Sequence, residues 1–178
     1  MNFLYESRTY PSEKNGAIKC FRVLSQWNVL VQGCGQTTSY TNAMWKNAMR
    51  RIPLHSGVKK VLMLGLGAGG MIPIVRNRLG NCSLTAIEWD PVMVQIAKEL
   101  GKHTENLNII LGDAYEELPR LKEQFDLILV DMFQGAKVSS PASQQSFITA
   151  LSSVLGRDGY LLCNVFSEPE LLTHYTPV

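Results

Sequence analysis

The sequence is short of net charge, of cysteine and histidine, and of long apolar runs. Its 178 residues carry 17 lysines and arginines against 15 aspartates and glutamates, which gives a formal net charge of +2. Proteins that bind nucleic acids or membrane surfaces are usually much more basic, so we expect neither class of partner. With 46% hydrophobic residues the chain is also too apolar for intrinsic disorder, and we expect a folded protein.

The few cysteines and histidines do not form a metal-binding pattern. No two cysteines stand in a C-x-x-C pair, and the three histidines are scattered along the chain. Widely spaced cysteines are typical of buried free thiols in a reducing compartment, and here they are Cys20, Cys34, Cys82 and Cys163. We therefore expect no metal ion and no disulfide framework.

The sequence also lacks the pattern of a targeting or membrane segment. Its first residues have neither the basic start nor the apolar core of a signal peptide. The most apolar stretch, residues 61–75, is short for a membrane span and contains several glycines and a proline. These features predict a cytoplasmic protein.

The pattern along the chain changes once, near residue 40. Two stretches rich in aromatic and β-branched residues predict the strands of a small hairpin or meander, residues 18–24 and 27–32. A helical pattern follows at residues 41–51, with Thr41 or Ser39 as its cap. We therefore divide the chain into a small N-terminal β segment, residues 1–40, and a larger domain, residues 41–178.

From residue 59 onward, strands and helices are expected to alternate. Short apolar runs predict strands at residues 61–64, 84–88, 107–111, 125–130 and 160–166. Amphipathic stretches with caps or glycine stops predict helices at residues 71–79, 92–100, 114–122 and 141–155. This order predicts an α/β fold, a Rossmann-like three-layer αβα sandwich with a mainly parallel sheet. Ligands of such folds bind at the carboxyl ends of the strands.

The first strand of this sheet leads directly into a glycine-rich loop, residues 65–70 (GLGAGG). Glycines permit a tight turn and a close approach of a ligand to the backbone, and the free N–H groups of a helix follow. The spacing of Gly65, Gly67 and Gly70 fits a dinucleotide fingerprint. A tight strand-to-helix turn without any ligand would give the same pattern.

Three acidic residues follow predicted strands at the same edge of the sheet. Glu88 ends the second strand, where a carboxylate can accept hydrogen bonds from both hydroxyls of a ribose. The glycine loop and Glu88 together do not separate a dinucleotide from S-adenosylmethionine. Asp113 follows the third strand, where it can accept from an adenine amino group beside the backbone of Ala114. Asp131 follows the fourth strand and would point into the same crevice.

Four consecutive motifs resemble those of class I S-adenosylmethionine-binding domains, and more narrowly those of the spermidine/spermine synthase family. The motifs are VLMLGLGAGG, LTAIEWDPVMVQIAKEL, IILGDAYEEL and FDLILVDMF. The resemblance implies that S-adenosylmethionine, or its decarboxylated form, is the cofactor, and that no metal is needed. It implies cofactor contacts at Gly65, Leu66, Gly67, Gly69, Glu88, Trp89, Asp113 and Ala114. It also implies that Asp131 is the catalytic aspartate, which helps to deprotonate an attacking amine.

The chain departs from this family where a polyamine would bind. An Asp of the family's glycine loop is here Ala68, and residues that support the polyamine are here the neutral Thr41, Asn42, Trp45 and Asn47. The resemblance places three residues at the acceptor cleft, and they are Gln36, Trp45 and Gln134. A neutral cleft favours methyl transfer to a small amine-like acceptor over aminopropyl transfer.

Three other functions stay open at this point. The first is aminopropyl transfer proper, as in polyamine biosynthesis. The second is a non-catalytic module that binds a nucleoside or a partner, and the third is an NAD-dependent reductase, because the glycine loop and Glu88 suit both cofactors.

Only about a dozen residues follow the fifth predicted strand, whereas related sheets usually have two more strands. We therefore expect a C-terminally shortened sheet whose fifth strand is an edge, and edges invite pairing or covering. A homodimer that covers this edge, or that uses the N-terminal β segment, is the expected assembly.

Overall fold

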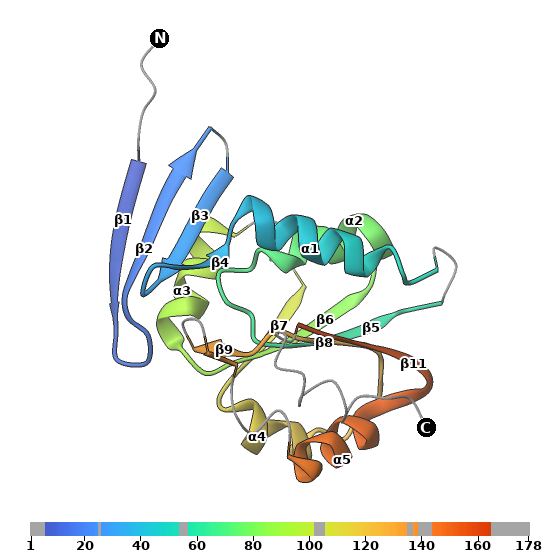
Figure 1. Ribbon diagram of the computed structural model, residues 1–178. Helices are drawn as coiled ribbons and strands as arrows, with labels where there is room; N and C mark the ends of the chain where they lie inside the picture. The colour runs from blue at the N-terminus through green and yellow to red at the C-terminus, as the bar shows by residue number, and fades with distance from the viewer. Residues whose placement is uncertain are drawn as a thin grey trace.

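The computed structural model describes residues 6–24, 26–53, 57–101, 106–134, 137–138 and 144–164. Within them the chain forms a small antiparallel sheet followed by a parallel sheet with helices on both faces (Figure 1). The expected Rossmann-like three-layer arrangement and the N-terminal β segment are thereby confirmed. No helix within the described residues is long and apolar enough to cross a membrane.

The N-terminal sheet is an antiparallel meander. Its strands are β1 (Glu6–Ser12), β2 (Gly16–Val23), β3 (Gln26–Val31) and β4 (Cys34–Thr37). The sequence predicted β2 and β3, which carry the buried side chains of this sheet. It missed β1, which has no buried side chain, and β4, which has only 4 residues.

The parallel sheet has the strand order β11-β8-β5-β6-β7, which corresponds to strands 5-4-1-2-3 of the Rossmann order 3-2-1-4-5-6. In chain order the strands are β5 (Lys60–Leu64), β6 (Ser83–Glu88), β7 (Leu107–Leu111), β8 (Phe125–Val130) and β11 (Leu155–Cys163). The central strands β5 and β8 are almost wholly buried, as their apolar runs predicted. A short hairpin of β9 (Phe133–Gln134) and β10 (Lys137–Val138) follows β8.

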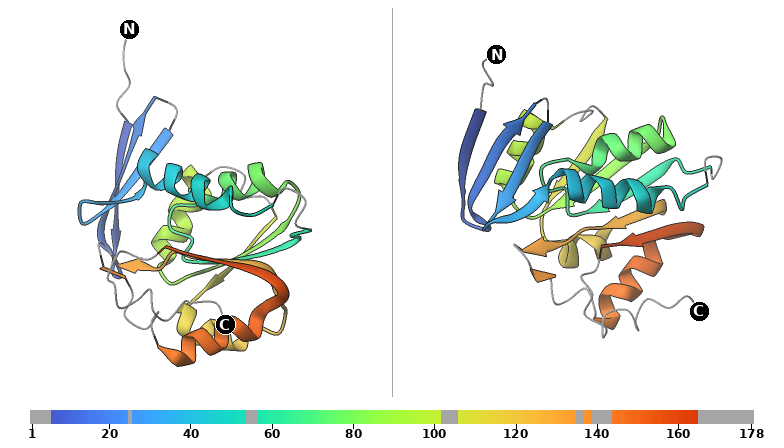
Figure 2. Two further views of the ribbon diagram at one scale, coloured as in Figure 1. Left: turned by 45° about the vertical axis from the view of Figure 1, so that its right-hand side comes forward. Right: turned by 45° about the horizontal axis from the view of Figure 1, so that its top comes forward.

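Helices cover both faces of the parallel sheet (Figures 1 and 2). On one face lie α1 (Ser39–Met49), α2 (Met71–Leu79) and α3 (Pro91–Leu100). On the other lie α4 (Ala114–Glu117), the 3-10 turn η1 (Leu118–Arg120) and α5 (Gln145–Val154). The helix expected at residues 114–122 is therefore divided into α4 and η1.

The N-terminal sheet packs onto α3 and onto the glycine loop. Ile18 and Cys20 of β2 are at most 1% exposed, and so are Val29 and Val31 of β3. These four side chains share one core cluster with Ala68, Met93 and Ile96. The meander is therefore fixed beside the carboxyl ends of the parallel strands, where the candidate site lies.

The start of α1 differs from the expectation. The helix begins at Ser39, and its N-cap is Thr38, so neither of the two predicted caps is correct. The Thr38 hydroxyl accepts from the Thr41 N–H at 3.2 Å, and the Thr41 hydroxyl accepts from the Thr38 N–H at 2.8 Å. This reciprocal capping box explains why the helix starts earlier than the apolar pattern suggested.

The boundary between α5 and β11 is also different. The helix expected at 141–155 ends one residue earlier, because Leu155 is already the first residue of β11 and pairs with Phe125 of β8. The strand expected at 160–166 thus starts sooner, and its register shifts before Tyr160. The predicted helix residues 141–143 and strand residues 165–166 lie outside the described part of the chain.

Candidate active site

The carboxyl ends of neighbouring parallel strands lie side by side at one edge of the sheet. Backbone hydrogen bonds continue the ladder past the strand ends: the Asp131 N–H donates to Leu64 O at 2.8 Å, and the Gly65 N–H to Ile87 O at 2.9 Å. The Asn164 N–H, after β11, donates to the last residue of β8 at 2.8 Å. Strand-end side chains from β5, β6, β8 and β11 are thereby held in fixed register.

The glycine loop between β5 and α2 requires glycine where it meets β8. Gly65 has a φ of +88°, and a Cβ there would lie 2.3 Å from the carbonyl oxygen of Asp131. Gly67 also has a positive φ, of +53°, but a Cβ there would meet nothing within 4 Å. The loop is therefore tight on the side of Asp131 and open at Gly67.

Glu88 holds this loop from β6. Its side chain is only 5% exposed, and its Oε2 accepts from the N–H groups of Leu66 at 2.9 Å and Gly67 at 2.8 Å. Its Oε1 accepts from the Asp90 N–H at 3.0 Å. Burial raises the pKa of Glu88 above its ordinary value, while the three N–H donors oppose this rise.

A carboxylate offers about four acceptor positions, so Glu88 keeps spare capacity on Oε1 for a ribose hydroxyl. Asp113 is exposed and uses Oδ1 to cap α4, through the Tyr115 N–H at 2.9 Å. Its Oδ2 accepts from no described residue. These acceptors suit the hydroxyl and amino donors of an adenosyl group, so the residues present fit S-adenosylmethionine.

Asp131 is held by donors from two distant parts of the chain. Its Oδ2 accepts from Nε1 of Trp45 on α1 at 3.0 Å, and its Oδ1 from Nδ2 of Asn164 after β11 at 2.8 Å. Burial raises the pKa of the Asp131 carboxyl, and the bonds from Asn164 and Trp45 pull that pKa back. The carboxylate is therefore oriented by two donors and keeps further lone pairs for an incoming group.

Asp131 lines a small hollow between the glycine loop and the start of α1. Six of the predicted site residues line it, and they are Gln36, Trp45, Gly65, Leu66, Gly67 and Asp131. Its other lining residues are neutral, and they are Thr37, Thr41, Asn42, Gly70 and Met71. Among the described lining residues Asp131 is thus the only one that ionises.

The other predicted residues do not line this hollow. Glu88 lies between the loop and the end of β6, Gly69 packs against α3, and Asp113 and Ala114 start α4. Trp89 is half-buried beside the N-terminal sheet. Gln134 ends β9, and only its backbone is described.

Sequence reasoning missed Asn164, which donates to Asp131. A signal for it was present, because Asn164 is the first polar residue after the apolar end of β11. The rule that led to Glu88 and Asp131 applies to it equally. The prediction extended the strand through this position and so passed over it.

The turn between β1 and β2 was also missed as part of the site. The Ser12 hydroxyl and Nδ2 of Asn15 both donate to Oδ2 of Asp90 at 2.6 Å. Nζ of Lys14 lies 5.0 Å from the ring centroid of Trp89. The N-terminal sheet thus directly supports the end of β6, where the cofactor is expected.

Comparisons with known proteins bear on the family and the fold. A family model described as a methyltransferase domain matches residues 61–159. The polyamine aminopropyltransferase of Pseudomonas syringae pv. tomato is 26% identical over 141 residues, which cover 74% of this chain and 49% of that protein. An eEF1A lysine and N-terminal methyltransferase homolog of Drosophila melanogaster is 25% identical over 125 residues, covering 64% of this chain and 19% of that protein.

Solved spermidine synthases share the fold. The enzyme of Thermotoga maritima matches with a TM-score of 0.72 at 21% identity, covering 94% of this chain and 60% of that chain. A probable spermidine synthase of Corynebacterium glutamicum matches with a TM-score of 0.76 at 18% identity, covering 93% and 66%. The chain spans about half the length of the curated aminopropyltransferases that it matches. It belongs to the methyltransferase-domain family and has a spermidine-synthase-like fold.

Proposed function

We propose that the protein transfers a group, most simply a methyl group, from S-adenosylmethionine to a small amine-like acceptor. The observation that carries the proposal is Asp131, a strand-end carboxylate fixed by Trp45 and Asn164 and open to the hollow beside the glycine loop. The methyltransferase-domain match supports the reaction class.

The proposed cofactor supplies a carbon activated by its bond to a sulfonium sulfur. The chain supplies acceptors for the adenosyl part, with Glu88 for the ribose hydroxyls and Asp113 for the adenine amino group. Glu88 also keeps the glycine loop closed against β6 through the N–H groups of Leu66 and Gly67. These residues bind and orient, which is what an in-line displacement mainly needs.

Asp131 is proposed to accept the proton that the attacking amine loses. An alkylamine resembles lysine, whose pKa is about 10, so its neutral form has to be generated before it attacks. Burial raises the pKa of Asp131 toward that of the amine, which reduces the free-energy cost of moving the proton to its carboxylate. Trp45 and Asn164 keep the accepting oxygens in place.

The neutral lining of the hollow supports a small acceptor over a polycation. Gln36, Thr37 and Asn42 would offer hydroxyl and amide groups, and Asp131 alone would offer a negative charge. A polyamine would therefore lack charge-assisted hydrogen bonds for its second ammonium group. Aminopropyl transfer is the second candidate, because curated relatives carry that activity in their names.

An NAD-dependent reaction is less well supported. A dinucleotide pyrophosphate needs free N–H groups in the glycine loop. Here the N–H groups of Leu66 and Gly67 already donate to Glu88. A phosphate bound at these two N–H groups would have to break both bonds, and it would leave the buried Glu88 carboxylate facing an anion.

Calorimetric titration with S-adenosylmethionine, its decarboxylated form, 5′-methylthioadenosine and NAD separates these possibilities. We expect S-adenosylmethionine to bind and NAD to show no heat. Binding of NAD alone would refute the proposal, and no binding at all would favour a non-catalytic interaction module. Tight binding of the decarboxylated form alone would move the assignment to aminopropyl transfer.

Turnover is tested with a panel of mono- and diamines and two product assays. S-adenosylhomocysteine reports methyl transfer, and 5′-methylthioadenosine reports aminopropyl transfer. We expect Asp131→Asn to lower the rate by about 100-fold or more while cofactor affinity stays within about threefold. Asp158→Asn, the same change at an exposed acid of β11, is the matched control and should be neutral. An Asp131→Asn protein with full turnover would exclude the proposed role.

A further inference from the structure

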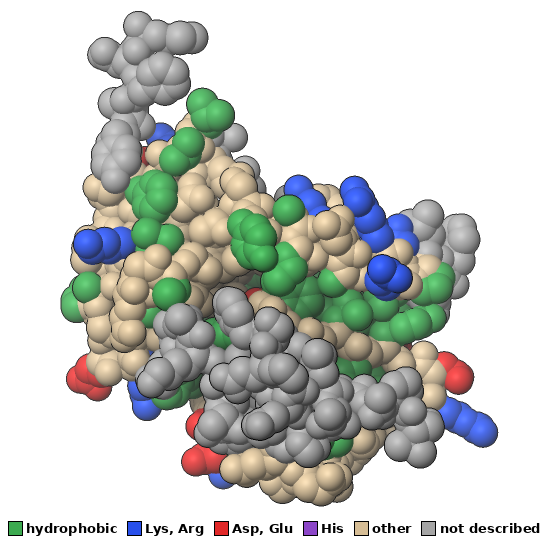
Figure 3. Space-filling view, viewed as in Figure 1, with side chains coloured by type: hydrophobic (Ala, Val, Ile, Leu, Met, Phe, Trp, Pro, Cys, Tyr) green, Lys and Arg blue, Asp and Glu red, His purple; other side chains and the backbone are tan. Residues whose placement is uncertain are grey.

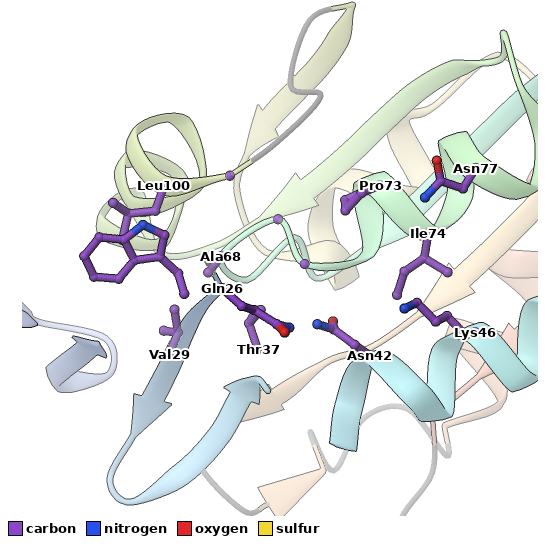
Figure 4. Close-up of a pocket in the computed structure, with 14 residues that line it drawn as sticks. Gln26, Val29, Thr37, Asn42, Lys46, Ala68, Pro73, Ile74, Asn77 and Leu100 are labelled. Carbon is purple, nitrogen blue, oxygen red and sulfur yellow. The ribbon is translucent and has the colours of Figure 1, made fainter. Parts of the chain in front are cut away.

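A second cavity, of about 390 Å³, lies behind the glycine loop (Figure 4). It is bounded by β3, β4, α1, α2 and the end of α3. Its volume falls within the usual range for sites that hold small molecules. Nothing in the proposed transfer reaction uses this cavity.

The cavity and the hollow of Asp131 share part of their lining. Thr37, Asn42 and Gly70 line both spaces. A Cβ on Gly70 would lie 2.7 Å from Cγ2 and 2.9 Å from Oγ1 of Thr37, and 3.4 Å from Oδ1 of Asn42. A side chain at Gly70 would therefore collide with Thr37, so the narrow place between the two spaces accepts only glycine.

One end of the cavity is apolar. Val29 of β3 and Leu100 of α3 lie at this end with Ala68 of the loop (Figure 4), and Trp27 also lines the cavity. Val29 and Ala68 are buried, at 1% and 6% exposure, and Trp27 is half-buried. Such a lining suits the ring or short chain of a ligand.

The other end is polar and carries one positive charge. Asn42 and Lys46, four residues apart on α1, face Pro73 and Asn77, four residues apart on α2 (Figure 4). No described residue accepts a hydrogen bond from the side chains of Asn42, Lys46 or Asn77. Lys46 is the only ionisable group among the described lining residues, and it has no ion-pair partner among them.

We propose that this cavity binds a small amphipathic anion, with an apolar ring against Val29 and Leu100 and a carboxylate beside Lys46. The two amides of Asn42 and Asn77 supply further donors for the carboxylate. Because Ala68, Gly69 and Gly70 form part of the wall, the ligand would contact the back of the loop whose front faces Glu88.

Fluorine NMR titration of the full chain with a matched pair of probes tests the proposal. The probes are 4-(trifluoromethyl)benzoate and the neutral 4-(trifluoromethyl)benzamide, which have nearly the same shape. We expect the benzoate to bind about fivefold more tightly or better, because only the anion gains a charge-assisted contact with Lys46. Equal affinities, or no binding of either probe, would refute the proposal.

Three variants locate the binding. Lys46→Gln should abolish the preference for the benzoate, and Asn77→Asp, which adds a like charge, should weaken the benzoate about fivefold and leave the benzamide unchanged. Lys122→Gln, at an exposed lysine elsewhere, is the control and should change neither probe. A preference that persists in Lys46→Gln would place the probe at another site.

Saturating S-adenosylhomocysteine provides an independent check on the separation of the two spaces. We expect the benzoate to stay bound in its presence. Displacement of the benzoate would show that the probe occupies the cofactor site, and it would overturn the proposal without touching the proposed transfer reaction.

Discussion

At the scale of single residues, the proposed chemistry depends on the carboxylate of Asp131. Its charged form is less stable in the folded protein than in water. Asp131 loses hydration on burial, and two neutral donors, Trp45 and Asn164, compensate only in part. A group of this kind is a common mark of a functional site, because its charge serves a purpose other than stability.

The first prediction concerns the pH dependence of Asp131→Asn stability. Because burial raises the folded-state pKa of Asp131 above its ordinary value of 3.8, ionisation costs stability once the pH exceeds that value. Well below pH 3.8 the carboxyl is protonated in both the folded and the unfolded state, so this loss of stability is absent. We therefore expect Asp131→Asn to melt a few °C above the parent at pH 7, and near the parent at pH 3.5.

Asparagine can keep both contacts in this variant. Its oxygen accepts from Trp45, and its amide nitrogen donates to Asn164 once the Asn164 amide is turned round. Melting curves followed by circular dichroism from pH 3.5 to 8 measure the effect. A variant that is less stable than the parent at pH 7 would contradict the assignment of a partly buried, energetically costly charge.

Some site residues could be predicted from the sequence, and others could not. Glu88, Asp113 and Asp131 were found because each lies at the end of a predicted strand or within two residues after it, which is a local pattern. The contacts of Ser12 and Asn15 with Asp90 were not, because the partners lie 78 and 75 residues apart. No local pattern encodes such a pairing.

At the scale of elements, predictions succeeded where burial imposes a pattern. The strands β5, β6 and β8 are buried runs, and their predicted limits agree with the structure to within one residue. The predictions failed where contacts outside an element decide whether that element forms or where it ends. The exposed β1 is held by pairing with β2, and α5 ends where β11 begins to pair with β8.

The second prediction compares two glycines of the same loop. Gly65→Ala should destabilise the protein by at least about 3 kcal/mol, because a Cβ would meet the Asp131 carbonyl oxygen at 2.3 Å in addition to the cost of a positive φ. Gly67→Ala incurs only the cost of the positive φ, because there is open space around the added Cβ. It should destabilise the protein by about 1–2 kcal/mol.

Urea unfolding of both variants measures this difference. Similar losses of stability would mean that the loop can move away from Asp131, so that Gly65 is not needed for the close approach. Because the two substitutions are chemically identical, the comparison isolates the contact between the loop and the end of β8.

At the scale of the whole molecule, β11 forms one edge of the parallel sheet within the described part of the chain. It pairs with β8 alone among the described strands, and none of its side chains is buried, whereas β8 has five buried positions. Figure 3 shows hydrophobic side chains gathered between α1 and the parallel sheet. Tyr160 and Leu162 of β11 are half-buried and pack against the core cluster that α1 and α2 share. An apolar edge strand of this kind invites pairing.

The third prediction is that the protein forms a homodimer through this edge. Light scattering at micromolar concentration should then give about twice the chain mass of 19.9 kDa. We expect Leu162→Lys, on β11, to yield a monomer that keeps the circular dichroism spectrum of the parent but melts at a lower temperature, because Leu162 is half-buried against the core.

Leu24→Lys, at a residue that directly follows β2 and is 80% exposed, is the matched control and should leave the dimer intact. A monomer from Leu24→Lys together with a dimer from Leu162→Lys would instead place the interface at the N-terminal sheet. A monomeric parent protein would refute the dimer altogether.

The anchoring of the β1–β2 turn on Asp90 has a consequence for how the molecule opens. Asp90 is fully buried and caps α3 through the Val92 N–H at 2.8 Å, while it also accepts from Ser12 and Asn15. The amide of Asp90 in turn donates to Glu88. The meander and the strand end that would hold the ribose should therefore unfold as one cooperative unit, with amide hydrogens that exchange with solvent at a common rate.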